Sequence, residues 1–157
     1  MVGTQSQGPD WLPVSQRAHE GHPGWTINQI KGLESTWTSL APDVVLIKAG
    51  TNDAGQGHSN ASMAADLDAL LAALRSSLPR ARLFITSILN LPDSHNPGLA
   101  ATITFYNKNT VPTLASRYNA TFVDIAGASG MCVSRAAPRD PKRSALSRAR
   151  VCVCVSN

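Results

Sequence analysis

The sequence predicts an α/β fold built on a parallel sheet, because short apolar runs alternate along it with amphipathic helical patterns. The runs are rich in Val, Ile, Leu and Phe, and their nearly continuous hydrophobicity is typical of strands buried on both faces. Strands that alternate with helices form β-α-β units, so we expect adjacent parallel strands joined by right-handed crossovers. The expected strands are residues 43–49, 82–88 and 121–125, and the expected helices lie near residues 26–40, 62–78 and 99–118.

The middle helix has the clearest pattern of the three. Its leucines recur at helical spacing and form one apolar face, Ser59 can cap its start, and Pro79 ends it. The last helix contains Pro112, which should kink or split it because proline has no backbone N–H to donate.

Composition divides the chain into two parts. Its 157 residues, 43% of them hydrophobic, suffice for one domain with a buried core. Residues 1–126 carry eight Lys or Arg against nine Asp or Glu, whereas residues 127–157 carry six against one. We therefore predict one domain over residues 1–131 and a basic, unstructured tail over residues 132–157. The run Val151 to Val155 alternates within this tail but has no evident partner.

Several classes of function are disfavoured. The basic tail has no aromatic residue to stack on bases, which argues against nucleic-acid binding. No apolar run is long enough to cross a membrane and the start lacks a basic-then-apolar leader, so no membrane partner is expected and the localisation stays unassigned. The three cysteines lack zinc-site spacing and no phosphate-binding glycine loop occurs, so we expect no metal and no cofactor.

Candidate chemistry lies beyond the first expected strand, at the carboxyl edge where open parallel sheets bind ligands. Gly50, Thr51, Asn52 and Asp53 follow this strand directly, although these residue types also favour a simple turn. A glycine-rich loop, residues 21–25, precedes the helix near 26–40 and offers free backbone N–H groups. Two sets of N–H donors at one sheet edge are what an oxyanion hole requires.

These motifs resemble those of the SGNH hydrolases, the GDSL esterase and lipase superfamily. Gly24 in His-Pro-Gly-Trp and Asn52 in Gly-Thr-Asn-Asp resemble its second and third blocks, and the wording from Glu20 to Ile27 is similar to microbial carbohydrate esterases that remove acetyl groups. The resemblance covers roughly residues 2–131. It implies a three-layer α/β/α, flavodoxin-like fold whose parallel strands have the order 2-1-3-4-5.

The resemblance also implies a site. Gly24 and Asn52 match the two oxyanion-hole residues, and His22, Trp25 and Asp53 lie where substrate contacts are expected. The implied substrate is a small ester or an acetylated carbohydrate, and the implied fold needs no metal or other cofactor.

The sequence departs from the family's pattern at both ends. It has no Gly-Asp-Ser block for the nucleophile and no Asp-x-x-His block after Ile125 for the base. By the resemblance, the fold then lacks its first strand and its last helix, which would leave one sheet face bare and open to self-association. Other hydroxyls and imidazoles could be offered as substitutes, but we expect these to be structural: Ser59, Ser87, His58 and His95.

Two hypotheses follow. The first is an SGNH-type esterase domain, active or derived from an active parent. The second is a non-enzymatic remnant, a binding or structural fragment that keeps the oxyanion loops as scaffold. Because nucleophile and base blocks are absent, we expect the chain by itself to be catalytically incompetent.

Overall fold

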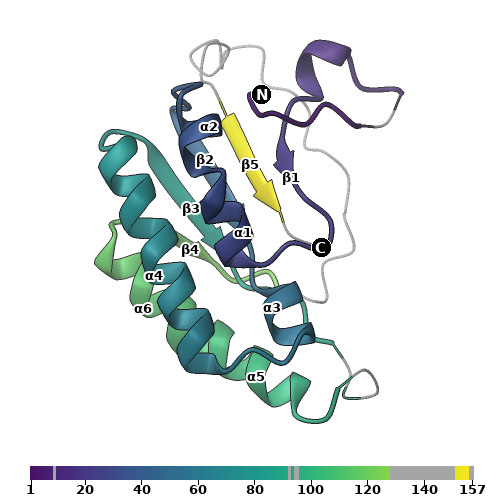
Figure 1. Cartoon of the computed structure of the whole chain (residues 1–157), viewed down its shortest axis with the longest axis vertical. Helices are drawn as coiled ribbons and strands as arrows, with labels where there is room; N and C mark the ends of the chain where they lie inside the picture. Colours follow the sequence, from purple (N-terminus) through teal and green to yellow (C-terminus); the bar gives the residue numbers. More distant parts are fainter. Residues whose placement is uncertain (9, 92, 94–95, 128–150, 156–157) are drawn as a thin grey trace.

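The computed structural model of the chain describes residues 1–8, 10–91, 93, 96–127 and 151–155 (Figure 1). Its centre is one parallel sheet of five strands in the order β1-β5-β2-β3-β4. The strands are β1 (Glu20–Gly21), β2 (Val44–Lys48), β3 (Arg82–Thr86), β4 (Thr121–Val123) and β5 (Val151–Val155).

The three predicted strands are confirmed as β2, β3 and β4, adjacent and parallel as expected. Their register aligns Leu46 of β2 with Phe84 of β3, and Phe84 with Thr121 of β4. The α/β class and the parallel sheet therefore follow the apolar runs of the sequence.

Strand β5 corrects the prediction of an unstructured tail for the five residues that form it. Val151 to Val155 pairs with β2 along its whole length and with β1 at Glu20 and Gly21. It fills the inner position that the resemblance gives to the family's first strand. The prediction failed because a strand's partners are set by tertiary pairing and leave no local signal. Residues 132–150 of the predicted tail lie outside the described residues.

The N-terminal segment differs from the resemblance as well. The edge strand that precedes β2 in the sequence is the two-residue β1, which the apolar runs did not predict, and Gln5 forms an isolated antiparallel bridge with His19. A short 3-10 helix, Val14–Gln16, lies between these segments.

Two of the three predicted helices are divided. The helix near 26–40 becomes α1 (Ile27–Gly32) and α2 (Glu34–Thr38), which meet at Leu33, whose backbone is not helical. The helix near 99–118 becomes α5 (Leu99–Phe105), a π-helical turn (Tyr106–Thr110) and α6 (Val111–Arg117). Pro112 lies in the first turn of α6, directly after the π-helical turn, so the expected disturbance takes the form of a wider turn within a continuous helical run.

The middle helix, α4 (Asn60–Ser77), is continuous, and the Ser59 hydroxyl accepts a hydrogen bond from the Ser62 N–H at its start. No helix in the described part of the chain has the length and apolar character needed to span a bilayer. The remaining helix is the short α3 (Thr51–Gly55), directly after β2.

The core lies between the sheet and the helices, and within the described residues the helices cover one sheet face. Val45, Ile47, Leu83 and Ile85 are buried, whereas the residues that alternate with them on β2 and β3 are partly or fully exposed. The third layer of the implied α/β/α sandwich is thus not formed by the described helices.

The π-helical turn supports the carboxyl ends of two strands. Its buried Tyr106 donates its phenolic O–H to the carbonyl of Ala49 at 3.1 Å. The neighbouring Asn107 exchanges two hydrogen bonds with the backbone of Ile88, just after β3. A wider helical turn directs two successive polar side chains towards the sheet, which an ordinary α-helical turn does less readily.

Both the backbone conformation at position 50 and the nearby ring of Tyr106 require a glycine there. Its φ of +116° lies in the left-handed region, and an added Cβ would lie 2.9 Å from the ring of Tyr106. We expect Gly50→Ala to lower the free energy of unfolding by about 2–5 kcal/mol, combining backbone strain with overpacking. Urea unfolding measures this change. Gly55→Ala is the matched control, because its Cβ meets no atom within 4 Å, and an equal loss in both variants would contradict the explanation.

Candidate active site

The two predicted loops meet beyond the carboxyl ends of β1 and β2. Gly24 lies in the turn after β1, with a positive φ of +81° and open space where a Cβ would be. Helix α1 begins just beyond, with Thr26 as its N-cap and a reciprocal capping box between Thr26 and Gln29. The cap fixes the direction in which the Gly24 turn enters the helix.

Asn52 comes from the other loop and contacts the first directly. Its side-chain Nδ2 donates to the carbonyl oxygen of Trp25 at 2.7 Å. A longer contact of 3.5 Å joins Gln56 Nε2 to the carbonyl oxygen of Gly24. The loops therefore lie together, as expected of an oxyanion pair. The Asn52 amide also engages the protein's own backbone, as the alternative of a simple turn predicts.

Asp53 lies in the interior, which corrects its assignment as a substrate contact. It is fully buried, and both carboxylate oxygens accept the N–H of Ile27, at 3.2 and 3.1 Å. This N–H is one of the free donors at the start of α1, so the carboxylate joins the two loops from beneath. Burial raises the pKa of Asp53 above its ordinary value, although the hydrogen bond from Ile27 opposes the shift.

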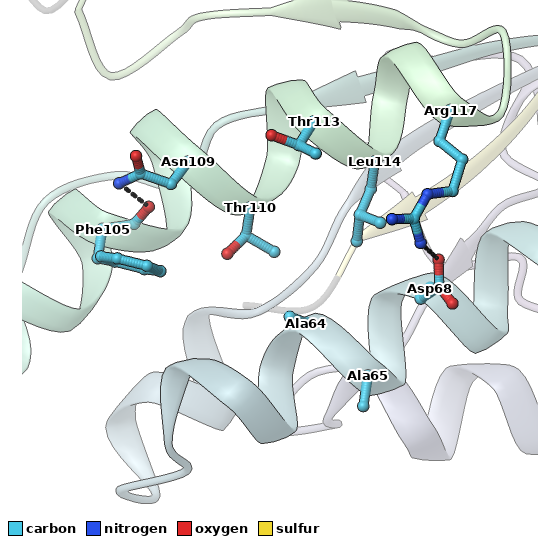
Figure 2. A pocket seen from close by; sticks show the side chains of 9 residues that line it. All are labelled: Ala64, Ala65, Asp68, Phe105, Asn109, Thr110, Thr113, Leu114 and Arg117. Carbon is cyan, nitrogen blue, oxygen red and sulfur yellow. Dashed lines mark hydrogen bonds and ion pairs between the residues drawn. The ribbon is translucent and has the colours of Figure 1, made fainter.

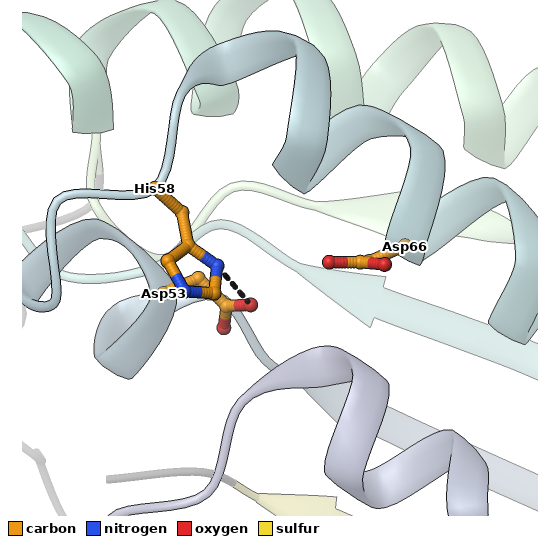
Figure 3. A group of neighbouring side chains, drawn as sticks. All are labelled: Asp53, His58 and Asp66. Carbon is orange, nitrogen blue, oxygen red and sulfur yellow. Dashed lines mark ion pairs between the residues drawn. The ribbon is translucent and has the colours of Figure 1, made fainter.

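His58 and Asp66 complete a small cluster around this carboxylate (Figure 3). His58 Nδ1 lies 3.6 Å from Asp53 Oδ1, and one ligand atom from each of the three residues lies within 4.8 Å of the others. Imidazole and carboxylate groups are donors that divalent metals accept. The cysteine spacing considered in the sequence could not reveal this group, which is assembled from α3, the loop after it and α4.

His22 is built into the first loop as part of a buried pair. Its Nε2 lies 3.0 Å from Glu20 Oε2, and its ring stacks on Trp25 with centroids 4.1 Å apart. Glu20 also accepts hydrogen bonds from the backbone and the hydroxyl of Thr4. His22 is 7% exposed, so it mainly orders the loop, whereas Trp25 is partly exposed beside it.

The alternative hydroxyls have structural roles, as expected. The buried Ser87 hydroxyl donates to Asp124 and accepts the N–H groups of Ile125 and Ala126, which fixes the segment after β4. Ser59 caps α4. Throughout the described ranges, no hydrogen bond joins a serine hydroxyl to a histidine, and His95 lies outside them.

A groove of about 410 Å³ lies on the helical side of the molecule, between α4 and the segment from α5 to α6 (Figure 2). Arg117 and Asp68 close one end with an ion pair of 2.8 Å. None of its lining residues belongs to the Gly24 or Asn52 loop, so this groove is separate from the candidate site.

Asp53→Asn should remove the loss of folding stability that ionisation of the buried Asp53 carboxyl causes as pH rises. Because the folded pKa is raised, the folded protein binds this proton more tightly than the unfolded chain, and wild-type stability falls as pH rises from 3.8 through the folded pKa. Asn cannot ionise, and its Oδ1 can still accept the Ile27 N–H. We expect the stability of the variant relative to wild type to rise over this window, measured by urea unfolding at several pH values. A difference in stability between variant and wild type that stays constant over this pH window would disprove the prediction.

Comparison with known proteins agrees with this geometry. A family 3 carbohydrate esterase of Clostridium thermocellum is similar over 80% of this chain, with 28% identity and a TM-score of 0.66. An acetyl esterase mutant, solved with an acetate ion, is 22% identical over 83% of the chain, with a TM-score of 0.66. A family 3 carbohydrate esterase from Talaromyces cellulolyticus is 24% identical over 82%, with a TM-score of 0.64. No curated protein sequence matches the chain significantly.

The matches extend over only part of those proteins. The chain spans 59%, 66% and 65% of their respective lengths. The described region nevertheless has their parallel sheet, with the two loops at its carboxyl edge. The family model for GDSL-like lipases and acylhydrolases matches residues 4–146. Over most of its length, from the first strand to beyond the last helix, this chain therefore belongs to the GDSL-like lipase/acylhydrolase family.

Proposed function

We propose that this chain carries the oxyanion-binding part of an ester hydrolase, with the Gly24 N–H and the Asn52 amide as its donors. The observation that carries the proposal is the meeting of the two loops at one edge of the sheet, where the 2.7 Å hydrogen bond from Asn52 Nδ2 to the carbonyl of Trp25 joins them. It joins the residue after Gly24 to the candidate donor on the other loop. Donors that are held in place before reaction stabilise developing negative charge without reorganising.

The proposed substrate is a small ester, with acetylated carbohydrate as the favoured class. Two of the similar structures are carbohydrate esterases of family 3, and a third is an acetyl esterase. Within the site, the partly exposed ring of Trp25, braced by His22, is the proposed contact for the substrate. An aromatic face of this kind suits the apolar side of a sugar ring or an acyl group.

In this proposal the chain by itself does not turn over. Ester hydrolysis of this type needs a hydroxyl whose proton is taken by a base as its oxygen attacks the carbonyl carbon. The sequence contains neither Gly-Asp-Ser nor a late Asp-x-x-His, and the chain spans less than two thirds of the compared esterases. The absence of those blocks favours, as second candidate, a non-enzymatic remnant that keeps the loops as scaffold.

Asn52→Ala distinguishes these possibilities. We expect the purified chain to hydrolyse p-nitrophenyl acetate no faster than a heat-denatured sample and to take up no fluorophosphonate. If turnover is found, loss of one oxyanion donor should lower kcat by about 10²–10³-fold. Asn109→Ala is the matched control, because its Nδ2 donates to the carbonyl of Phe105 on its own helical segment, away from both loops. Activity that is lost with Asn52 but kept without Asn109 would refute the remnant, whereas activity indifferent to both would belong to a contaminant.

We also propose that the less covered sheet face mediates self-association. Leu46 and Phe84 lie side by side on it and are partly exposed, and Val123 at the neighbouring strand is 39% exposed. Sedimentation velocity should show a concentration-dependent dimer that Phe84→Ser weakens. The exposed Phe105→Ser, on the helical side, should leave association unchanged, and a monomer at every concentration would contradict this proposal.

A further inference from the structure

Strand β5 separates two strands that otherwise have no contact in the sheet. Among the described strands, β1 pairs only with β5, whereas β2 pairs with both β5 and β3. The short β1 therefore joins the sheet entirely through the C-terminal strand. We call the space between β1 and β2 the acceptor gap.

The register places the end of β5 level with the start of both functional loops. Val155 is aligned with Gly21 on one side and with Lys48 on the other. The chain reaches Gly24 three residues beyond Gly21, and Asn52 four residues beyond Lys48. With one strand in the acceptor gap, Gly21 and Lys48, from which the two loops start, are separated by two strand spacings, about 9–10 Å.

Without β5, the distance between β1 and β2 would either shrink to that of neighbouring strands or no longer be fixed by pairing. If β1 paired directly with β2, the loop origins would lie one spacing apart, about 4.8 Å. If it did not pair, its backbone groups would lack their partners in the sheet. Either way the contacts of Asn52 with Trp25 and of Asp53 with Ile27 would have to change.

The occupant of the gap has the chemistry that an inner strand needs. Residues 151–155 read Val-Cys-Val-Cys-Val, with no charge, no proline and no glycine, while the sequence before them is strongly basic. Inner strands pair on both sides, so charge and proline are poorly tolerated there. The segment that occupies the gap is therefore suited to an inner position by its extended backbone, its lack of charge and its three valines.

We propose that the acceptor gap is a strand-binding site whose ligand is this chain's own segment Val151–Val155, and that its occupancy positions the Gly24 loop against the Asn52 loop. The role given to the loops rests on the proposed function, but strand pairing does not. The tests below report on pairing alone, so their failure is distinguishable from failure of the oxyanion assignment.

A disulfide trap tests the occupant. In a background that carries Cys132→Ser, Cys152→Val and Cys154→Val, the pair Lys48→Cys and Val155→Cys should oxidise rapidly within one molecule, because aligned residues on neighbouring strands are close enough for a disulfide. The control pair Lys48→Cys and Val151→Cys should not close, because Val151 is aligned with Val44. A disulfide-linked dimer, or equal behaviour of both pairs, would overturn the proposal.

Proline substitution tests the positioning role. Successive N–H groups of a strand point to opposite neighbours, and Cys154 and Val155 are aligned with both β1 and β2, so the double variant Cys154→Pro, Val155→Pro removes a donor on each side. We expect amide exchange in residues 20–32 to accelerate about tenfold or more while α4 stays protected. The matched Cys154→Val, Val155→Ile variant should exchange like wild type.

A synthetic peptide of the same alternation, Val-Ala-Val-Ala-Val, should restore protection of residues 20–32 in the double-proline variant. Unchanged exchange in that variant would show that β5 does not hold β1. Equal loss of amide protection in α4 would show that β5 stabilises the whole fold and does not specifically position the Gly24 loop. Either result overturns the positioning role.

Discussion

The candidate site depends on a single buried acceptor, the carboxylate of Asp53. It takes the first N–H of α1 with both oxygens while it lies in the helical turn that also carries Asn52. A helix start must satisfy its free N–H groups, and here a residue from another loop does so. The same contact thus ends one loop, begins the next helix and fixes their relative position. Desolvation opposes the charge, so the bond from Ile27 stabilises a group that the interior otherwise disfavours.

Support for this contact comes from beneath the sheet edge. Tyr106 donates to the carbonyl of Ala49, the residue just before Gly50, and its ring occupies the space that a side chain at Gly50 would need. Gly50 then turns the chain from β2 directly into α3. The tight turn, the buried phenol and the π-helical turn that delivers it form one unit. Packing far from the loops therefore determines where Asn52 and Asp53 begin.

Much of this architecture could be predicted from local pattern. Leucines at helical spacing predicted α4, and the apolar runs around Val45, Leu83 and Phe122 predicted three neighbouring parallel strands. Pro112 predicted a disturbance of the last helix, where the π-helical turn lies, and the two loop motifs predicted that the Gly24 and Asn52 loops lie together. The regular spacing of apolar residues on a buried face can be seen in the local sequence. These elements can therefore be predicted without knowing which distant segments they pack against.

What could not be predicted arises from pairing between distant segments. The alternation of Val151 to Val155 looks the same in a free tail as in an inner strand, because the difference lies in β1 and β2. Asp53 seemed a ligand contact, since its residue type and place suit one, until Ile27 proved to be its partner. Glu20 belongs to the loop motif, but nothing in the motif predicted its contacts with Thr4 and His22. Charged residues near a sheet edge do not reveal by themselves which of them face inward.

The inner position of β5 also constrains the order of events during synthesis. The other four strands and all the described helices emerge from the ribosome before Val151 does. Until then β2 presents an unpaired edge on one side, and β1 has no strand beside it. Such an edge is open to pairing with other chains, and completion of the sheet requires contacts between segments far apart in sequence, which form slowly. The nascent chain therefore passes through a state with an exposed edge, in which chaperone binding or aggregation competes with closure by its own C-terminal strand.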